Sequence, residues 1–170
     1  MDLKSLIRDV PNFPKPGIVF KDICPLLSHP QGLTVISQSL AALAAPARPT
    51  VISAIESRGF IFGAALAQHL GLPFVPMRKP GKLPGETYSM EFKLEYGSDR
   101  LEVHCDAFAA ADRVAIVDDV LATGGTAQAA GELVRKVGAT PSLYLFVIAL
   151  DFLKGQERLG QVPWHALVHY

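Results

Sequence analysis

The chain has 170 residues, of which 49% are hydrophobic and 19% charged, and its formal net charge is +0 with an isoelectric point of about 7.0. This length suits a single globular domain over residues 1–170, whose core needs no disulfide bonds. The balanced charge argues against a dedicated nucleic-acid-binding protein, which usually carries a basic face. The two cysteines, Cys24 and Cys105, lack the spacing of metal ligands.

The first part of the chain predicts short elements separated by prolines. Apolar spacing indicates a short helix over residues 2–9, and three prolines with a glycine force residues 10–17 into an extended, turning path. A longer helix is expected over residues 31–45, because Pro46 ends its apolar pattern. The N-terminus has no apolar stretch behind a basic start, and no apolar run is long enough to span a membrane. We therefore expect a cytoplasmic protein.

The rest of the chain alternates apolar strands with helices. Strands are expected over residues 50–55, 72–77, 101–105, 113–117 and 142–150, and helices over 59–71 and 124–138. Residues 79–100 are polar and rich in Gly and Pro, which predicts a flexible loop whose middle can pair as a hairpin. The tail predicts a small helix near 153–159 and a strand near 165–169. The alternation predicts an α/β fold with a parallel central sheet and helices on both faces.

The stretch VAIVDDVLATGGT places two acids and a Thr-Gly-Gly-Thr turn directly after a buried strand. Ligands bind beyond the carboxyl ends of strands in an open α/β sheet, and a glycine pair before a helix lets the backbone bind an anion closely. The acids Asp118 and Asp119 would repel a phosphate, so they suit sugar hydroxyls or a metal ion. The pattern predicts a site for a ribose 5′-phosphate and lacks the lysine of a P-loop. A phosphatase- or receiver-like acid pair and a capped helix remain alternatives.

This stretch resembles the phosphoribosyl-pyrophosphate (PRPP) signature of type I phosphoribosyltransferases. The resemblance implies that Asp118 and Asp119 hold the ribose hydroxyls. The 5′-phosphate would be bound by Ala122, Thr123, Gly124, Gly125 and Thr126.

Three further stretches resemble the adenine-specific branch of that family. They are FPKPGIVFKDI at 13–23, ESRGF at 56–60, and RKPGKLP at 78–84 together with LEYG at 94–97. The resemblance implies an N-terminal base-binding hood over residues 1–30, in which Val19, Phe20, Lys21 and Leu150 contact adenine. Pyrophosphate would be bound by Glu56, Ser57, Arg58, Arg78, Lys79 and Lys82, with a cis bond between Glu56 and Ser57. Glu95 and Tyr96 would be the catalytic pair on the loop, and Phe92 stands where relatives often have Tyr.

The implied activity is purine salvage, in which the phosphoribosyl group of PRPP is transferred to adenine to give AMP and pyrophosphate. Mg²⁺ would arrive with PRPP rather than in a protein cage, and the family implies a homodimer that binds neither nucleic acid nor membrane. Two alternatives remain: a transferase for xanthine, guanine or orotate, and a non-catalytic regulator that senses PRPP.

Overall fold

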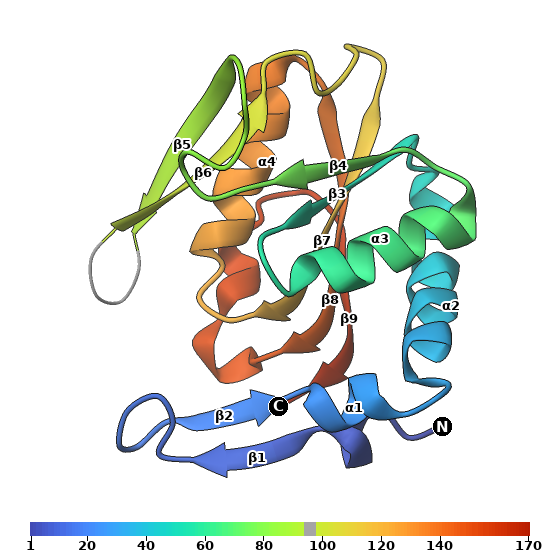
Figure 1. The fold of residues 1–170 in the computed structure, drawn as a ribbon, viewed down its shortest axis with the longest axis vertical. Coiled ribbons are helices and arrows are strands. Elements are labelled where there is room, and N and C mark those ends of the chain that lie inside the picture. The colour runs from blue at the N-terminus through green and yellow to red at the C-terminus, as the bar shows by residue number, and fades with distance from the viewer. Residues whose placement is uncertain (94–97) are drawn as a thin grey trace.

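The computed structural model describes residues 1–93 and 98–170, and its centre is a sheet of five parallel strands (Figure 1). The order of strands across the sheet is β4-β3-β7-β8-β9. These strands are β3 (Val51–Ile55), β4 (Phe74–Met77), β7 (Arg113–Leu121), β8 (Thr140–Ala149) and β9 (Trp164–His169). The predicted parallel sheet is confirmed.

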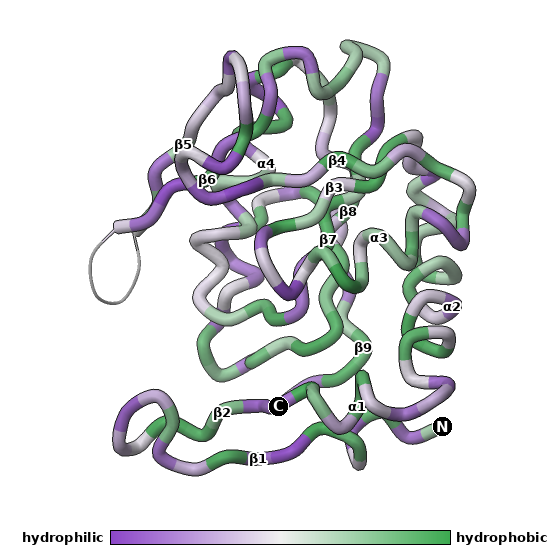
Figure 2. Tube along the Cα trace, in the orientation of Figure 1, coloured by the Kyte–Doolittle hydropathy of each residue, from purple (hydrophilic) through white to green (hydrophobic). Residues whose placement is uncertain are grey.

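Helices cover both faces of this sheet, as predicted. On one face lie α2 (Gly32–Ala44) and α3 (Gly59–Leu70), and on the other lies α4 (Gly125–Val137). Successive residues of β7 alternate between the two cores: Val114 and Ile116 belong to the core on the α4 side, whereas Ala115 and Val117 belong to the core on the α2 and α3 side. Because both faces are buried, the strand is continuously apolar from Val114 to Val117. Figure 2 shows this apolar centre.

The N-terminal segment differs from the predicted helix over residues 2–9. Only a 3₁₀ turn forms, at Lys4–Leu6, and the chain then enters β1 (Arg8–Pro11), which pairs antiparallel with β2 (Val19–Asp22). Ion pairs between Arg8 and Asp22 and between Lys21 and Asp9 connect the two strands. Cross-strand pairing therefore overrides the local helical spacing, and Pro11 would in any case end a helix. A short helix that the sequence did not predict, α1 (Cys24–Ser28), follows.

The segment predicted as a long loop contains an antiparallel hairpin of β5 (Thr87–Lys93) and β6 (Ser98–His104). The hairpin packs against α4 on the outside of the molecule. Near the C-terminus, the helix predicted near 153–159 is wrong, because Lys154 adopts a φ of 53° and divides the segment into two 3₁₀ turns, Asp151–Leu153 and Gly155–Arg158. The final predicted strand is confirmed as β9.

Candidate functional site

Two loops meet at the carboxyl end of the central sheet. One carries Glu56, Ser57 and Arg58 from β3 into α3, and the other carries residues 122–124 from β7 into α4. The strands β3 and β7 are parallel neighbours, so their loops emerge at the same edge. Parallel α/β sheets bind ligands at this edge, and the two sequence motifs are therefore brought to one place.

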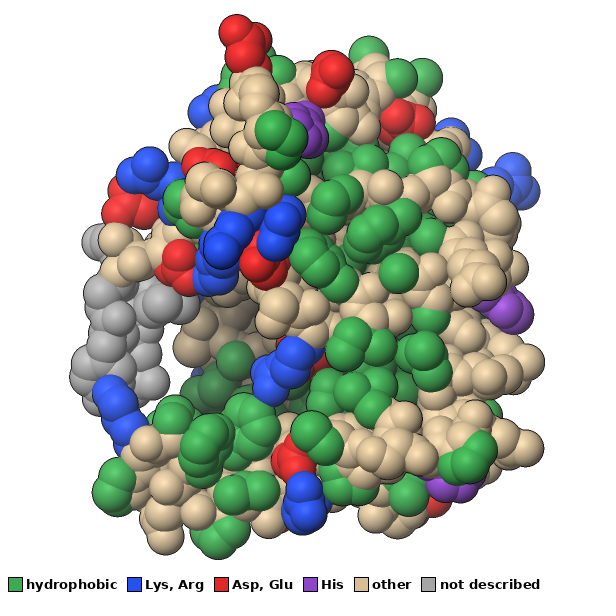
Figure 3. Space-filling view, viewed as in Figure 1, with side chains coloured by type: hydrophobic (Ala, Val, Ile, Leu, Met, Phe, Trp, Pro, Cys, Tyr) green, Lys and Arg blue, Asp and Glu red, His purple; other side chains and the backbone are tan. Residues whose placement is uncertain are grey.

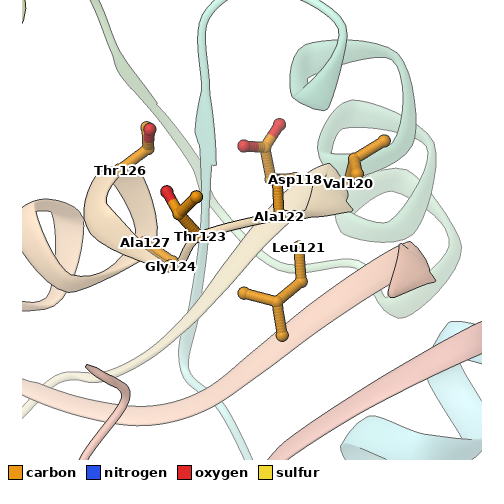
Figure 4. A pocket seen from close by; sticks show the side chains of 8 residues that line it. All are labelled: Asp118, Val120, Leu121, Ala122, Thr123, Gly124, Thr126 and Ala127. Atoms are coloured by element: carbon orange, nitrogen blue, oxygen red, sulfur yellow. The ribbon is translucent and has the colours of Figure 1, made fainter. Parts of the chain in front are cut away.

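The loop after β7 lines a pocket of about 140 Å³ together with the end of the strand. In Figure 4 the carboxylate of Asp118 and the hydroxyl groups of Thr123 and Thr126 point to one side of the loop, while Leu121 points to the other. Gly124 has a φ of 81°, in the left-handed region, and precedes the first residue of α4. The free N–H groups at the start of this 13-residue helix face the same loop, which suits an anion.

Asp118 and Asp119 both lie beside this pocket, but the environments of their carboxylates differ. Asp119 is buried, with 6% of its surface exposed, and its Oδ2 atom accepts no hydrogen bond within residues 1–93 and 98–170. Asp118 accepts a hydrogen bond from the Asp119 backbone N–H at 2.8 Å. Burial and the neighbouring charge of Asp119 raise the pKa of Asp118 well above its ordinary value. Asp119 is thus shielded from water, whereas Asp118 is half-buried and lines the pocket, where a ligand can reach its carboxylate.

Arg58 links this acid pair to the N-terminal hairpin. Its Nε atom lies 2.6 Å from Asp119 Oδ2, and its guanidinium carbon lies 5.3 Å from the centre of the Phe20 ring. The Phe20 ring in turn meets Phe13 edge to face, with 5.2 Å between the ring centroids. A cation that contacts both the acid pair and an aromatic ring marks the meeting point of three segments that are distant in the sequence.

Two other basic residues are already paired with carboxylates. Arg78 donates from Nε and Nη2 to the two carboxylate oxygens of Glu56, each at 3.2 Å, and the Lys79 backbone N–H donates to Glu56 at 2.9 Å. These contacts, with the charge of Lys82, lower the pKa of Glu56 although burial opposes the shift. The ammonium group of Lys79 pairs with Asp99 on β6. Through Glu56, Arg78 therefore holds the loop that carries Arg58 in place. Lys79 connects the same region to the β5–β6 hairpin.

The β1–β2 hairpin forms one wall of a hollow in the molecule. Figure 3 shows this hollow between the hairpin and the main body, with basic side chains near its edge. Phe13 and Val19 on the hairpin are 51% and 49% exposed, which is high for apolar side chains. Exposed apolar groups beside polar loops are typical of a site for a flat, partly apolar ligand.

Comparison with known proteins agrees with this geometry. The family model "Phosphoribosyl transferase domain" matches residues 26–159. The adenine phosphoribosyltransferase of a Synechococcus species is 56% identical over 170 residues, covering 100% of this chain and 99% of that protein. The chain belongs to the adenine phosphoribosyltransferase family.

Solved structures of this family have the same fold. The crystal structure of adenine phosphoribosyltransferase from Thermoanaerobacter pseudethanolicus has a TM-score of 0.96 and 46% identity, and covers 99% of this chain and 98% of that chain. The enzyme from Saccharomyces cerevisiae, complexed with an imino-altritol bisphosphate and adenine, has a TM-score of 0.93 and 43% identity, and covers 98% and 96%. The type I phosphoribosyltransferase fold is therefore confirmed.

Within this family fold, most residues singled out from the sequence lie around the two loops. The cis peptide bond between Glu56 and Ser57 is present, as the resemblance implied. Leu150 follows β8, and its backbone N–H donates to the Leu121 carbonyl at 2.9 Å, beside the pocket. Glu95 and Tyr96 lie outside the described residues.

Two glycines that were not among the predicted site residues also shape the candidate site. A Cβ at Gly59 would lie 2.8 Å from Asp118 Oδ1, and one at Gly155 would lie 2.2 Å from the Ala122 carbonyl oxygen. Gly59 lies within the ESRGF stretch at 56–60, which was an available signal. Gly155 lies in the tail, where no motif distinguishes it from an ordinary turn glycine.

Proposed function

We propose that this protein transfers the 5-phosphoribosyl group of PRPP to adenine, releasing AMP and pyrophosphate. The observation that carries this proposal is the acid pair of β7, which lies beside an anion-binding loop and opposite Arg58. In the reaction the bond from C1 of the ribose to pyrophosphate breaks, and a bond from C1 to N9 of adenine forms. N9 loses its proton, and pyrophosphate leaves with the bonding electrons.

The donor's ribose phosphate fits the loop after β7. We assign the 5′-phosphate to the backbone N–H groups and hydroxyls of residues 122–126, because this loop lines the pocket and the Thr123 and Thr126 hydroxyls point to the same side of it in Figure 4. The ribose hydroxyls are assigned to Asp118 and Asp119. The buried Oδ2 of Asp119 supports this role: it pairs with Arg58 but accepts no hydrogen bond from the described residues, and such an atom gains from a hydroxyl donor.

The pyrophosphate fits the loop after β3, where Arg58 supplies positive charge. Neutralising the leaving group's charge lowers the barrier to its departure. We assign Glu56 and Ser57 to shaping this loop, because Glu56 binds Arg78 and the backbone of Lys79. Arg78, Lys79 and Lys82 are assigned to the same anion. Arg78 and Lys79 would exchange a carboxylate partner for a phosphate when the donor binds.

We propose that Mg²⁺ reaches the site bound to PRPP. No side chain is assigned as a direct ligand of the ion. Asp118 and Asp119 would lie near it through the ribose hydroxyls that they hold, and water would fill much of its coordination shell. When bound, the ion supplies positive charge to the pyrophosphate that leaves.

Adenine fits between the N-terminal hairpin and the segment after β8. We assign ring packing to Phe20 and Leu150, and recognition of the 6-amino group to the backbone carbonyls near Val19 and Lys21. An acceptor built for an amino group is left unpaired by a 6-oxopurine, which disfavours hypoxanthine and guanine. The exposed face of Val19 and the edge-to-face pair of Phe13 and Phe20 support this placement.

We assign Glu95 and Tyr96 to catalysis from their sequence motif. Glu95 would exchange a proton with the base near N7 while N9 attacks the ribose, and closure of residues 79–100 would exclude water from the cationic centre. Glu95→Gln is expected to lower the single-turnover rate, because an amide does not take up the proton. An unchanged rate, with chemistry shown to limit the single turnover, would remove Glu95 from this role.

The deciding experiment is a base panel with PRPP and Mg²⁺, in which nucleotide and pyrophosphate are measured together. We expect AMP and pyrophosphate in equal amounts from adenine, and far slower turnover of hypoxanthine, xanthine, guanine and orotate. Equal turnover of hypoxanthine would contradict the adenine assignment. Tight binding of PRPP with no pyrophosphate released from any base would instead indicate a PRPP-sensing regulator.

The family resemblance also leads us to propose a cytoplasmic homodimer that binds neither nucleic acid nor membrane. No helix in the described part of the chain is long and apolar enough to cross a membrane. Light scattering coupled to size-exclusion chromatography tests the dimer: a mass of one chain at micromolar concentration would contradict it.

A further inference from the structure

The aromatic ring of Tyr170, the residue that follows β9, contacts the side-chain ammonium groups of two lysines. Lys21 Nζ lies 3.7 Å from the ring centroid, and Lys4 Nζ lies 4.5 Å from it. Lys21 belongs to β2 of the base-binding hairpin, and Lys4 to the 3₁₀ turn that precedes β1. The Tyr170 ring therefore contacts the N-terminal segment at two points that are 17 residues apart in the sequence. Figure 1 places this end of the chain beside β2.

The backbone of Tyr170 is attached to the end of the central sheet. Its N–H donates to the Ala149 carbonyl at 3.0 Å, and its carbonyl accepts from the Asp151 N–H at 2.9 Å. These two partners are the immediate neighbours of Leu150, the residue assigned to the base. Tyr170 thus has its backbone on the Leu150 segment and its ring against β2, which are the two sides of the proposed adenine site.

The contact with Lys21 has the features of a strong cation–π interaction. The Lys21 side chain is only 13% exposed, and its ammonium group also pairs with Asp9 at 2.7 Å. A desolvated cation gains more from an aromatic face than an exposed one. Lys4 adds a second attachment, since its Nζ donates to the His169 carbonyl at 2.8 Å.

We propose that Tyr170 is a positioning residue for adenine, holding β2 at a fixed separation from the segment that carries Leu150. This inference rests on the proposed function, because it assigns recognition of the base to the backbone near Val19 and Lys21. A backbone acceptor selects a donor only at hydrogen-bonding distance, so a shift of β2 weakens binding of the base. PRPP is bound by other loops and keeps its affinity.

The test compares Tyr170→Leu with Tyr170→Phe. Leucine keeps an apolar side chain but is smaller and has no π face, whereas phenylalanine keeps the face and loses only the hydroxyl. For the leucine variant we expect a rise of about three- to tenfold in the KM for adenine, and a change of less than about twofold in the KM for PRPP. The phenylalanine variant should match the wild type for both substrates. Lys21→Met should reproduce the leucine effect, and combining it with Tyr170→Leu should add little.

Hydrogen exchange gives a readout that does not depend on activity. In Tyr170→Leu the amides of β1 and β2 should exchange faster, while those of β7 keep their wild-type rates. Unchanged exchange in the hairpin together with an unchanged KM for adenine would overturn the proposal, as would equal increases in both KM values. If the wild type fails to use adenine at all, the proposed function fails, and the exchange data still decide whether Tyr170 anchors the hairpin.

Discussion

Gly124 and Gly155 lie backbone against backbone: a Cβ on Gly124 would be 2.2 Å from the Gly155 carbonyl oxygen. In the opposite direction, a Cβ on Gly155 would lie 2.2 Å from the Ala122 carbonyl oxygen and 2.9 Å from the Gly124 nitrogen. Both glycines are buried. The 3₁₀ turn Gly155–Arg158 therefore packs against the loop that follows β7, at a distance that no side chain permits.

Gly155→Ala is expected to displace this loop, because the added methyl group meets backbone atoms that have no rotamer to change. We expect the KM for PRPP to rise about tenfold or more, a loss of about 1.4 kcal/mol in binding, with little change in the KM for adenine. Steady-state kinetics with each substrate varied in turn measures this difference. Glu157→Ala, an exposed position on the same turn, is the matched control and should behave as the wild type. An unchanged KM for PRPP in the glycine variant would show that the loop does not depend on this contact.

Asp118→Asn should stabilise the protein without ligand while weakening its function. The pKa of Asp118 is raised in the folded protein, so the folded state holds this proton more tightly than the unfolded state. Its contribution to the free energy of unfolding therefore falls as pH rises from the ordinary aspartate value of 3.8 through the raised pKa.

Asparagine has no ionisable carboxyl group, so the variant does not lose this part of its stability as the pH rises. We expect the Tm of the variant to exceed that of the wild type at pH 8, and the two to converge near pH 4. Calorimetry across this range provides the measurement, and kinetics should show a higher KM for PRPP. A lower Tm than the wild type at pH 8 would mean that the ionised carboxylate is stabilised by its surroundings.

Arg58→Met should affect the reaction more strongly than folding. It removes the cation that lies 2.6 Å from Asp119 Oδ2 and, by our assignment, the charge that stabilises the leaving pyrophosphate. We expect kcat/KM for PRPP to fall about 100-fold or more. The Tm should fall only modestly, since the Arg58 side chain is 43% exposed and solvent screens its ion pair.

The control for Arg58→Met is Arg113→Met, which removes the same charge at the start of β7, the opposite end of the strand from the acid pair. This variant should retain kcat/KM for PRPP. Equal losses in the two variants would indicate a general effect of net charge.

Removal of Mg²⁺ should abolish transfer and leave the fold intact. We expect EDTA to stop AMP formation, Mg²⁺ to restore it, and the Tm without substrates to be the same in both conditions, because the ion is bound only together with PRPP. Titration calorimetry should detect Mg²⁺ binding only when PRPP is present. Tight Mg²⁺ binding to the protein alone would contradict this assignment.

The sequence by itself determined the parallel sheet, the positions of α2, α3 and α4, the placement of Asp118 and Asp119 directly after the buried part of β7, and the loop that carries Arg58. These follow from local rules: buried strands are continuously apolar, helices have apolar spacing and end at glycines such as Gly71 and Gly138, and parallel strands bring their carboxyl ends to one edge.

Only the tertiary structure decided what depends on contacts between distant segments. The turn at Gly155 contacts the loop after β7, about 30 residues earlier, and the pairing of Arg8 with Asp22 replaces a local helix by a hairpin. Likewise, Tyr170 meets Lys21 only because β9 ends beside the hairpin. Each of these contacts depends on which surfaces folding brings together, and local residue patterns do not contain this information.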